Sequence, residues 1–272
     1  MAVNQRIKYR LVKVLCVGII VGVLFGMLIM AGGARSAVKK KQKELQTAGA
    51  ELKEENKKLE KQLKEVQAGE SAADIAKKNA EQLASDADDW CLVLVNSSHP
   101  VDTSYTPELT AIEEDESVDS RIADETNQML QDAKDAGMNL YIVSGYRDYN
   151  DQREVFNQTM SDWIAQGKTP LEAYEETEKS VAVPGTSEHS TGLALDITSG
   201  EYGELDDQQA GTEESQWLAE NCYKYGFILR YPSDKSDATG IVYEPWHYRY
   251  VGKDAAKEIT EQGITLEEYL GK

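Results

Sequence analysis

The chain has 272 residues, enough for one domain of ordinary size together with additional segments. Its formal charge of -19 is unevenly divided: residues 1–68 carry 14 Lys and Arg against 6 Asp and Glu, whereas residues 69–272 carry 15 against 42. Such an acidic body argues against nucleic-acid binding, which needs Lys and Arg opposite phosphate, and it predicts a solvated, self-repelling surface.

An uncharged run of 21 residues occupies positions 14–34. A helix of that length, at ~1.5 Å per residue, spans a hydrocarbon core about 30 Å thick, and the run is long for a secretory signal. We therefore expect a transmembrane signal anchor after a cytoplasmic tail at 1–13. Cleavage near Ala34 or Ala37 is the alternative. Basic residues flank both ends almost equally, so charge does not fix the orientation.

Residues 35–68 are predicted to form a coiled-coil stalk, because apolar residues recur every seven positions at Leu45, Leu52, Leu59 and Val66. Asn56 would then occupy an a position, where a lone Asn sets the register of two-stranded coiled coils. The pattern favours a homodimer through the stalk no more than a solvated single helix that acts as a spacer. Residues 69–88 are expected to form a further helix or linker.

The body, residues 89–272, mixes predicted strands and helices without strict alternation. We expect strands at 90–95, 139–143, 193–198 and 243–251, and helices at 119–136, 152–166, 214–225 and 253–262. This mixture is typical of an α+β fold with helices against an antiparallel sheet.

The three cysteines do not form a metal-binding pattern. Cys16 lies in the apolar run, and Cys91 and Cys222 are far apart in the body, with no C-x-x-C spacing. Two buried free thiols and a Cys91–Cys222 disulfide are both compatible with the sequence.

Two of the three histidines lie among other candidate metal ligands. His189 and Asp196 share one segment, and His247 follows Glu244 in another. Two imidazoles and one carboxylate match the three protein ligands that catalytic zinc commonly takes. Hydrolysis also needs a nearby carboxylate to move a proton, and Glu244 is the candidate. His99, in a Ser- and Asn-rich loop, is interpreted as an ordinary histidine.

The spacing of Glu244 and His247 makes a demand on the backbone. Pro245 excludes a helix interior, and a regular strand would turn residues three apart toward opposite faces. A bend or bulge near Pro245 is therefore required if both side chains enter one site.

Three blocks in the body resemble, in order and approximate spacing, the signature blocks of VanY-type D-alanyl-D-alanine carboxypeptidases, of the zinc DD-/LD-carboxypeptidase family. They are Ser144-Gly145-Tyr146-Arg147 with Gln152, Ser187-x-His189-x-x-Gly192-x-Ala194-x-Asp196, and Glu244-Pro245-Trp246-His247. The resemblance covers about Asp89 to Tyr269 and implies a hedgehog/DD-peptidase-like fold.

The resemblance also implies roles for individual residues. Zinc would be held by His189, Asp196 and His247. Glu244 would be the general base, and Arg147 would hold the substrate carbonyl and stabilise the developing oxyanion, a role that suits a planar, permanently charged guanidinium. The residues expected to contact the substrate are Ser187, Gln152, Tyr146 and Trp246.

The function implied is that of a membrane-anchored, extracytoplasmic zinc carboxypeptidase that removes the terminal D-Ala from peptidoglycan stem peptides. An LD-carboxypeptidase acting on tetrapeptide stems would use the same residues and is the alternative. A non-catalytic wall-binding module is a weaker alternative, because a binding domain has no use for Glu244. An acidic loop, Gly200 to Glu213, would be either a lid or a solvated connection, and we favour the connection.

Overall fold

The computed structural model describes residues 40–50, 53, 57 and 71–272, and the chain divides into two units, Met1–Ser71 and Ala72–Lys272. In the first unit, residues 40–50 are helical. The expected transmembrane segment and most of the expected stalk lie outside the described residues. Across the described part of the chain, no helix combines the length and apolar character needed to cross a membrane.

The second unit contains six strands, eight α-helices and four 3-10 turns among its described residues. The strands are β1 (Leu109–Ala111), β2 (Ser117–Asp119), β3 (Leu140–Ser144), β4 (Ala194–Ser199), β5 (Phe227–Tyr231) and β6 (Glu244–Tyr250). The α-helices are α3 (Ala72–Leu83), α4 (Ala123–Asp135), α5 (Tyr149–Ala165), α6 (Pro170–Thr177), α7 (Glu213–Asn221), α8 (Ser236–Thr239), α9 (Lys253–Gln262) and α10 (Leu266–Leu270). The 3-10 turns are η1 (Ser120–Ile122), η2 (Glu188–Thr191), η3 (Asp207–Gly211) and η4 (Cys222–Tyr225).

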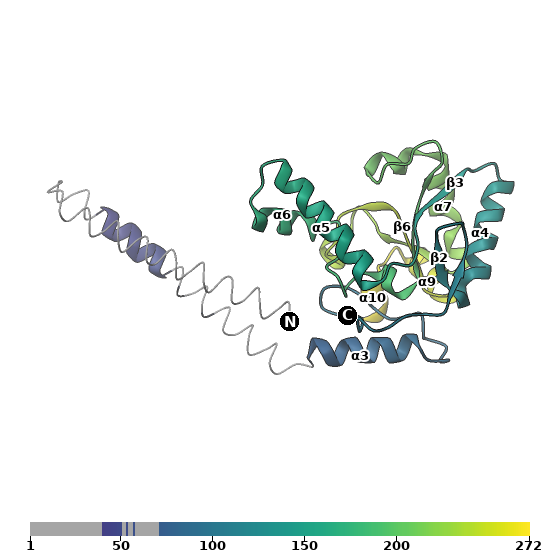
Figure 1. Ribbon diagram of the computed structural model, residues 1–272, viewed down its shortest axis with the longest axis horizontal. Coiled ribbons are helices and arrows are strands. Elements are labelled where there is room, and N and C mark those ends of the chain that lie inside the picture. Colours follow the sequence, from purple (N-terminus) through teal and green to yellow (C-terminus); the bar gives the residue numbers. More distant parts are fainter. Residues whose placement is uncertain (1–39, 51–52, 54–56, 58–70) are drawn as a thin grey trace. The chain divides into compact units, whose positions relative to one another are not determined.

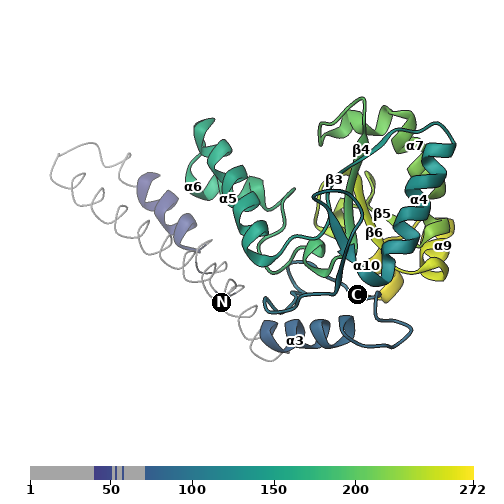
Figure 2. The ribbon, with the colours of Figure 1, turned by 45° about the vertical axis from the view of Figure 1, so that its right-hand side comes forward.

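A four-stranded antiparallel sheet in the order β3-β4-β6-β5 forms the centre of this unit, and β1 and β2 form a separate hairpin (Figure 1). Helices α4, α7 and α9 cover one face of the sheet, while α5 and α6 lie on its other side (Figure 2). Leu195, Phe227 and Tyr248 are fully buried between the sheet and its helices. The predicted α+β class with an antiparallel sheet is confirmed.

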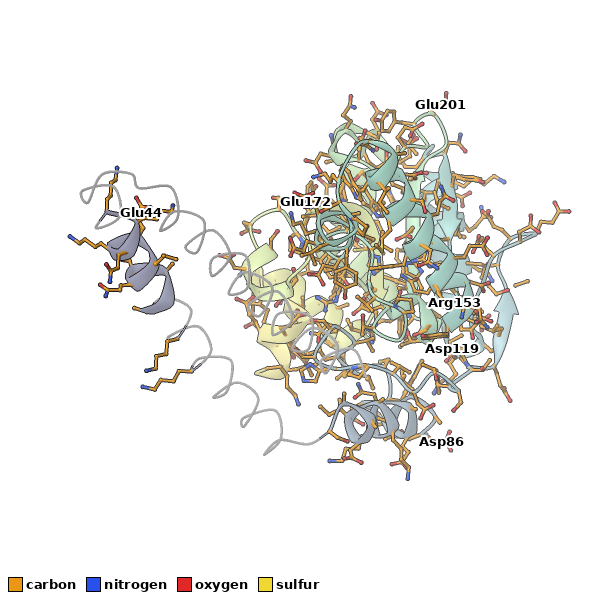
Figure 3. The ribbon with its side chains drawn as sticks, turned by 60° about the vertical axis from the view of Figure 1, so that its left-hand side comes forward. Glu44, Asp86, Asp119, Arg153, Glu172 and Glu201 are labelled. Carbon is orange, nitrogen blue, oxygen red and sulfur yellow. The ribbon has the colours of Figure 1, made fainter. Side chains whose placement is uncertain are left out.

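Acidic side chains spread over the surface of the body. Asp86 after α3, Glu172 on α6 and Glu201 in the turn after β4 are all exposed (Figure 3). Asp119 differs, because it is buried and paired with Arg121. The charge that the sequence places in this part of the chain is therefore largely solvated.

The apolar run at 90–95 is not the strand that we expected. Its backbone is irregular, although Cys91, Val93 and Val95 are buried. The guanidinium of Arg249 donates to the carbonyl oxygens of Cys91 and Val93, at 2.9 and 2.8 Å. A side chain thus satisfies buried backbone groups that a neighbouring strand would otherwise satisfy.

Helix α3, in the stretch expected to be a helix or linker, belongs to the same compact unit as the body. The side-chain amide of Asn79 donates to the carbonyls of Leu94 and Pro100, at 3.3 and 2.9 Å. Sequence periodicity also missed β1, β2, β5, α6 and α10, which are all short.

Candidate active site

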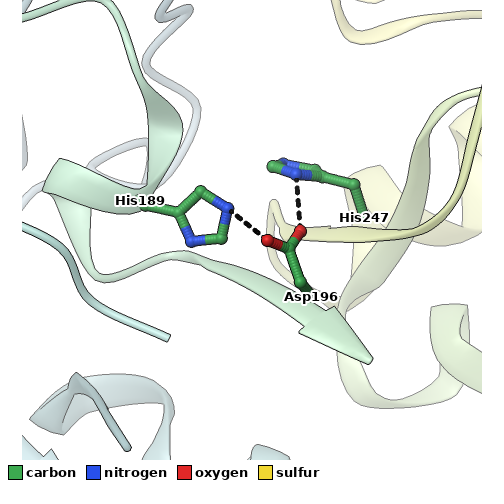
Figure 4. A group of neighbouring side chains, drawn as sticks. All are labelled: His189, Asp196 and His247. Atoms are coloured by element: carbon green, nitrogen blue, oxygen red, sulfur yellow. Dashed lines mark ion pairs between the residues drawn. The ribbon is translucent and has the colours of Figure 1, made fainter. Parts of the chain in front are cut away.

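The three predicted metal ligands come together at the centre of the sheet. Asp196 on β4 lies directly opposite His247 on β6, and His189 belongs to η2, the turn that precedes β4 (Figure 4). One atom from each side chain lies within 4.8 Å of the others, and all three residues are buried.

A glycine makes this approach feasible. Gly192 ends η2 at φ 72°, in the left-handed region, and a Cβ there would lie 2.8 Å from the backbone nitrogen of Asp119. A larger residue would have to displace that backbone, so Gly192 allows the chain to turn from His189 into β4.

Each imidazole directs one nitrogen at Asp196 and the other at a protein acceptor. For His189, Nε2 lies 3.2 Å from Asp196 and Nδ1 lies 2.7 Å from the carbonyl oxygen of Gly145. For His247, Nδ1 lies 3.1 Å from Asp196 and Nε2 lies 3.3 Å from Glu188. Outer acceptors of this kind fix the tautomer of metal-binding histidines.

The carboxylate between the imidazoles has room for a cation. Asp196 Oδ1 is buried and lies 3.1 Å from His247 Nδ1, so it has no donor when that imidazole is neutral with its proton on Nε2. A buried carboxylate oxygen without a donor is unfavourable, and a metal ion would supply the missing partner. Two imidazoles and one carboxylate with an open side fit zinc.

Burial shapes the ionisation of these ligands. It opposes the charge of Asp196, but the two imidazoles outweigh it and hold the pKa of Asp196 well below its usual range. Burial, assisted by Arg147, lowers the pKa of His189. Burial also opposes the charge of His247, yet the hydrogen bonds to Asp196 and Glu188 raise its pKa to about 9. A metal ion therefore competes with a proton at His247.

The strand irregularity demanded by Glu244 and His247 is present. Between the pairs Leu229–Tyr248 and Tyr231–Glu244 the β5–β6 register shifts, so that β6 uses four residues where β5 uses two. As a result Glu244 Oε2 lies 3.7 Å from His247 Nδ1, and both side chains line one cavity. Burial raises the pKa of Glu244 to about 8, which suits a group that must gain and lose a proton near neutral pH.

Arg147 reaches the same cavity from the segment between β3 and α5. Its Nε donates to Gln152 Oε1 at 3.0 Å, and its Nη1 donates to Ser144 Oγ at 2.7 Å. Nη1 also lies 3.4 Å from Asp196. Gln152 in turn donates to the carbonyl of Ala182 at 2.8 Å. Both ends of the Gln152 amide are thus engaged, and the residue holds Arg147 in place.

Two cavities meet at Ser187. The metal cavity, about 200 Å³, is lined by the three ligands and by Arg147, Glu244 and Trp246 among others. The second, about 320 Å³, contains Tyr146, Gln152 and many hydroxyl groups. The four residues expected to contact the substrate are therefore divided: Trp246 lies at the metal, Tyr146 and Gln152 in the hydroxyl-lined cavity, and Ser187 in both.

Sequence reasoning missed the surroundings of His247. Glu188 stands inside the second signature block and Tyr231 is the last residue of β5, yet the sequence suggested a role for neither. Glu188 is buried and contacts His247, and the ring of Tyr231 lies 4.9 Å from the imidazole and lines the metal cavity. A glutamate beside a ligand histidine, together with arginines in apolar strands, was the available signal.

The structure bears on two alternatives that the sequence left open, the state of the cysteines and the role of the acidic loop. Cys91 and Cys222 are both buried and free. In the loop between β4 and α7, Leu205 lines the metal cavity and Gln209 is fully buried, so the loop is more than a solvated connection.

The comparisons agree on one family. The family model described as "VanY: D-alanyl-D-alanine carboxypeptidase" matches residues 115–253, a range that includes every residue discussed above as a metal ligand, base, guanidinium or expected substrate contact. A D-alanyl-D-alanine carboxypeptidase of Enterococcus faecalis is 42% identical over 185 residues, covering 68% of this chain and 67% of its own length.

Two solved structures resemble the fold and differ in what they cleave. A mutant of the vancomycin-resistance D,D-pentapeptidase VanY in complex with Zn(II) is 41% identical, with a TM-score of 0.61 over 66% of this chain and 99% of its own. The LD-carboxypeptidase LdcB is 40% identical, with a TM-score of 0.58 over 66% of this chain and 85% of its own. With the donor set above, the first of these assigns zinc as the metal of the site.

Proposed function

Because the chain belongs to the VanY family of D-alanyl-D-alanine carboxypeptidases, we propose that it removes the terminal D-Ala from peptidoglycan stem peptides, with Glu244 as the general base. The observation that carries this proposal is the meeting of three metal ligands, one buried carboxylate and one guanidinium at a single cavity. A site that only binds the wall would need no such carboxylate.

In the proposed reaction, Glu244 accepts a proton from the attacking water while the oxygen of that water bonds to the scissile carbonyl carbon. The carbon–nitrogen bond then breaks, and Glu244 returns the proton to the leaving amine, which departs as free D-Ala. Zinc in such a site polarises carbonyl groups and makes water a nucleophile near neutral pH. The burial of Glu244 supports this role, because a carboxylate with a raised pKa can both take and return a proton.

Arg147 would stabilise the negative charge that develops on the carbonyl oxygen. Its guanidinium is held by Ser144 and Gln152, its side chain is 20% exposed, and it lines the metal cavity. Donors fixed before the reaction stabilise a transition state without reorganisation. The hydroxyl-lined cavity beyond Ser187 would receive the leaving D-residue, with Tyr146 on its wall, and Trp246 would contact the acyl side of the peptide.

The second candidate is an LD-carboxypeptidase that trims tetrapeptide stems. The likeness to LdcB favours it, because that enzyme resembles this chain about as closely as the D,D-pentapeptidase does. The chemistry of metal, base and guanidinium is indifferent to the configuration of the acyl residue, so the walls of the metal cavity would decide between them.

We further propose that the body works outside the cell, anchored by the apolar segment at 14–34, because its proposed substrate lies there. The alternatives of a cleaved signal and of a dimeric stalk concern the same unit of the chain and do not alter the chemistry of the site.

The test is to incubate the full chain with purified penta- and tetrapeptide muropeptides and to follow both by mass spectrometry. We expect loss of one D-Ala from the pentapeptide; cleavage of the tetrapeptide alone would establish the LD alternative. Glu244→Ala should keep its zinc and lose activity by about 10²–10⁴-fold, the usual contribution of a positioned base. Glu201→Ala, on an exposed turn, is the matched control. Full activity in Glu244→Ala would contradict the assigned role.

A further inference from the structure

Four charged side chains form a buried cluster behind the metal site. Glu188 Oε1 accepts from Arg230 Nε and from Arg249 Nη1, both at 2.8 Å. The two Nη atoms of Arg230 donate to the carboxylate of Glu267, at 2.9 and 2.7 Å. The side chains of Glu188, Arg230 and Arg249 are fully buried, and that of Glu267 is 7% exposed. Two positive and two negative charges therefore compensate one another away from water.

One oxygen of this cluster faces the metal centre. Glu188 Oε2 lies 3.3 Å from Nε2 of His247, on the side of the ring away from Asp196. A proton on Nε2 is then donated to Glu188, and the lone pair of Nδ1 is left for the metal. The orientation of the Glu188 carboxylate thus selects the tautomer that a ligand needs.

The carboxylate of Glu188 is itself held by the two arginines, and they are fixed in different ways. Arg249 is tied to the backbone carbonyls of Cys91 and Val93. Arg230 uses the rest of its guanidinium on Glu267, in a paired arrangement that sets its plane. Without Glu267, both Nη groups of Arg230 would be buried without these partners.

Glu267 comes from a part of the chain that the family model does not reach. It lies on α10, beyond the matched residues 115–253. Leu266 next to it is fully buried in a small apolar cluster, and Thr265 caps the helix, so α10 is docked on the body. Glu267 lines neither of the two cavities.

We propose that Glu267 is a positioning residue of the metal centre, which acts through Arg230 and Glu188 to hold the imidazole of His247 with Nδ1 toward the metal. The last described helix is then part of the assembly of the site, although it touches neither metal nor peptide. The inference rests on the metal site and is independent of which peptide is cleaved.

The first experiment measures the zinc affinity of the full chain by competition with a chromophoric chelator. We expect Glu267→Gln to weaken zinc binding by about tenfold, the lower end of the range for outer partners of metal ligands. The matched control is Glu268→Gln on the same helix, which loses only an exposed pair with Lys235 and one capping contact and should stay within twofold of the parent. Equal affinities for Glu267→Gln and the parent would overturn the proposal, as would an equal loss in Glu268→Gln, which would assign the effect to docking of α10 in general.

The second experiment reads the imidazole directly. The chain has only three histidines, so ¹⁵N-labelled histidine gives three rings whose nitrogen shifts distinguish the two tautomers. In the zinc-loaded parent we expect the proton of His247 on Nε2 and that of His189 on Nδ1. Glu267→Gln should broaden or shift the His247 nitrogens and leave those of His189 unchanged. Unchanged His247 signals, or equal changes in both rings, would contradict the proposal.

Glu267→Asp provides a second variant if the glutamine variant does not fold, because it keeps the charge and shortens the side chain by one methylene group. The proposal predicts the same selective change at His247 and a smaller loss of zinc affinity. A parent-like affinity and a parent-like His247 spectrum in this variant would then overturn it.

Discussion

The two sides of the active site are held together by different kinds of interaction. On the β6 side, His247 contacts Glu188, which is held by Arg230 and Arg249, so the supporting side chains are charged and buried. On the side between β3 and α5, the supports other than the ligand Asp196 are neutral: the carbonyl of Gly145 holds His189, while Ser144 and Gln152 hold Arg147.

This difference determines how strongly each side should respond to a change. Removal of one partner from a buried set of charges leaves another charge uncompensated, whereas loss of a neutral hydrogen bond has a small net effect. A support made by the backbone cannot be deleted by substitution and can only be displaced. We therefore expect the largest effects behind His247 and the smallest around Arg147.

The largest expected effect is that of Arg249→Leu. It leaves Glu188 with one arginine fewer and removes the donor of two buried carbonyls, Cys91 and Val93. We expect a loss of about 3–5 kcal/mol in the free energy of unfolding, measured by urea titration of the metal-free protein. The exposed Lys257, paired with Glu261, gives the control Lys257→Leu, which should change stability by about 0.5 kcal/mol or less. A loss below about 1 kcal/mol in Arg249→Leu would show that the charged side is no more firmly coupled than the neutral one.

An intermediate effect is expected from Gly145→Ala on the neutral side. The added Cβ would overlap the carbonyl oxygen of Ser117, so the segment that carries the Gly145 carbonyl must move away from β2 and take the support of His189 with it. We expect about 1–3 kcal/mol of destabilisation, as for other overpacked sites, measured in the same titration. Gly203→Ala is the control, since a Cβ there meets no neighbour within 4 Å. If Gly145→Ala behaved like its control, the Gly145 carbonyl would not be fixed by the contact with β2.

The sequence predicted the parts of the site that occur in short, ordered blocks. His189, Asp196, His247 and Glu244 do meet at one cavity, and the irregularity in β6 that the spacing around Pro245 required is present. The family resemblance is confirmed by the match over residues 115–253. The transmembrane and coiled-coil segments stay predictions, because most of them lie outside the described residues.

What the sequence could not supply were partners that are remote along the chain. Arg230 and Glu267 are 37 positions apart, and Arg249 and Cys91 are 158 apart, so no local pattern links them. For the same reason the apolar run at 90–95 suggested a strand: periodicity reports burial of side chains, but it does not say which group satisfies the backbone. The short elements β5, α6 and α10 were missed because a few residues carry too little periodicity.

The smallest expected effect is that of Ser144→Ala, which removes one neutral partner of Arg147 and leaves the bond from Nε to Gln152. A net loss of about 1 kcal/mol in the transition state corresponds to about a fivefold fall in kcat. If Arg147 acts on the developing oxyanion, kcat and kcat/KM should fall together and KM should not change. The measurement is steady-state release of D-Ala from a stem pentapeptide, with Ser161→Ala on the exposed side of α5 as the control. A rise in KM at constant kcat would instead assign Arg147 to binding of the ground state. A fall in kcat that corresponds to about 3–5 kcal/mol, the loss of stability expected on the charged side, would remove the distinction between the two supports.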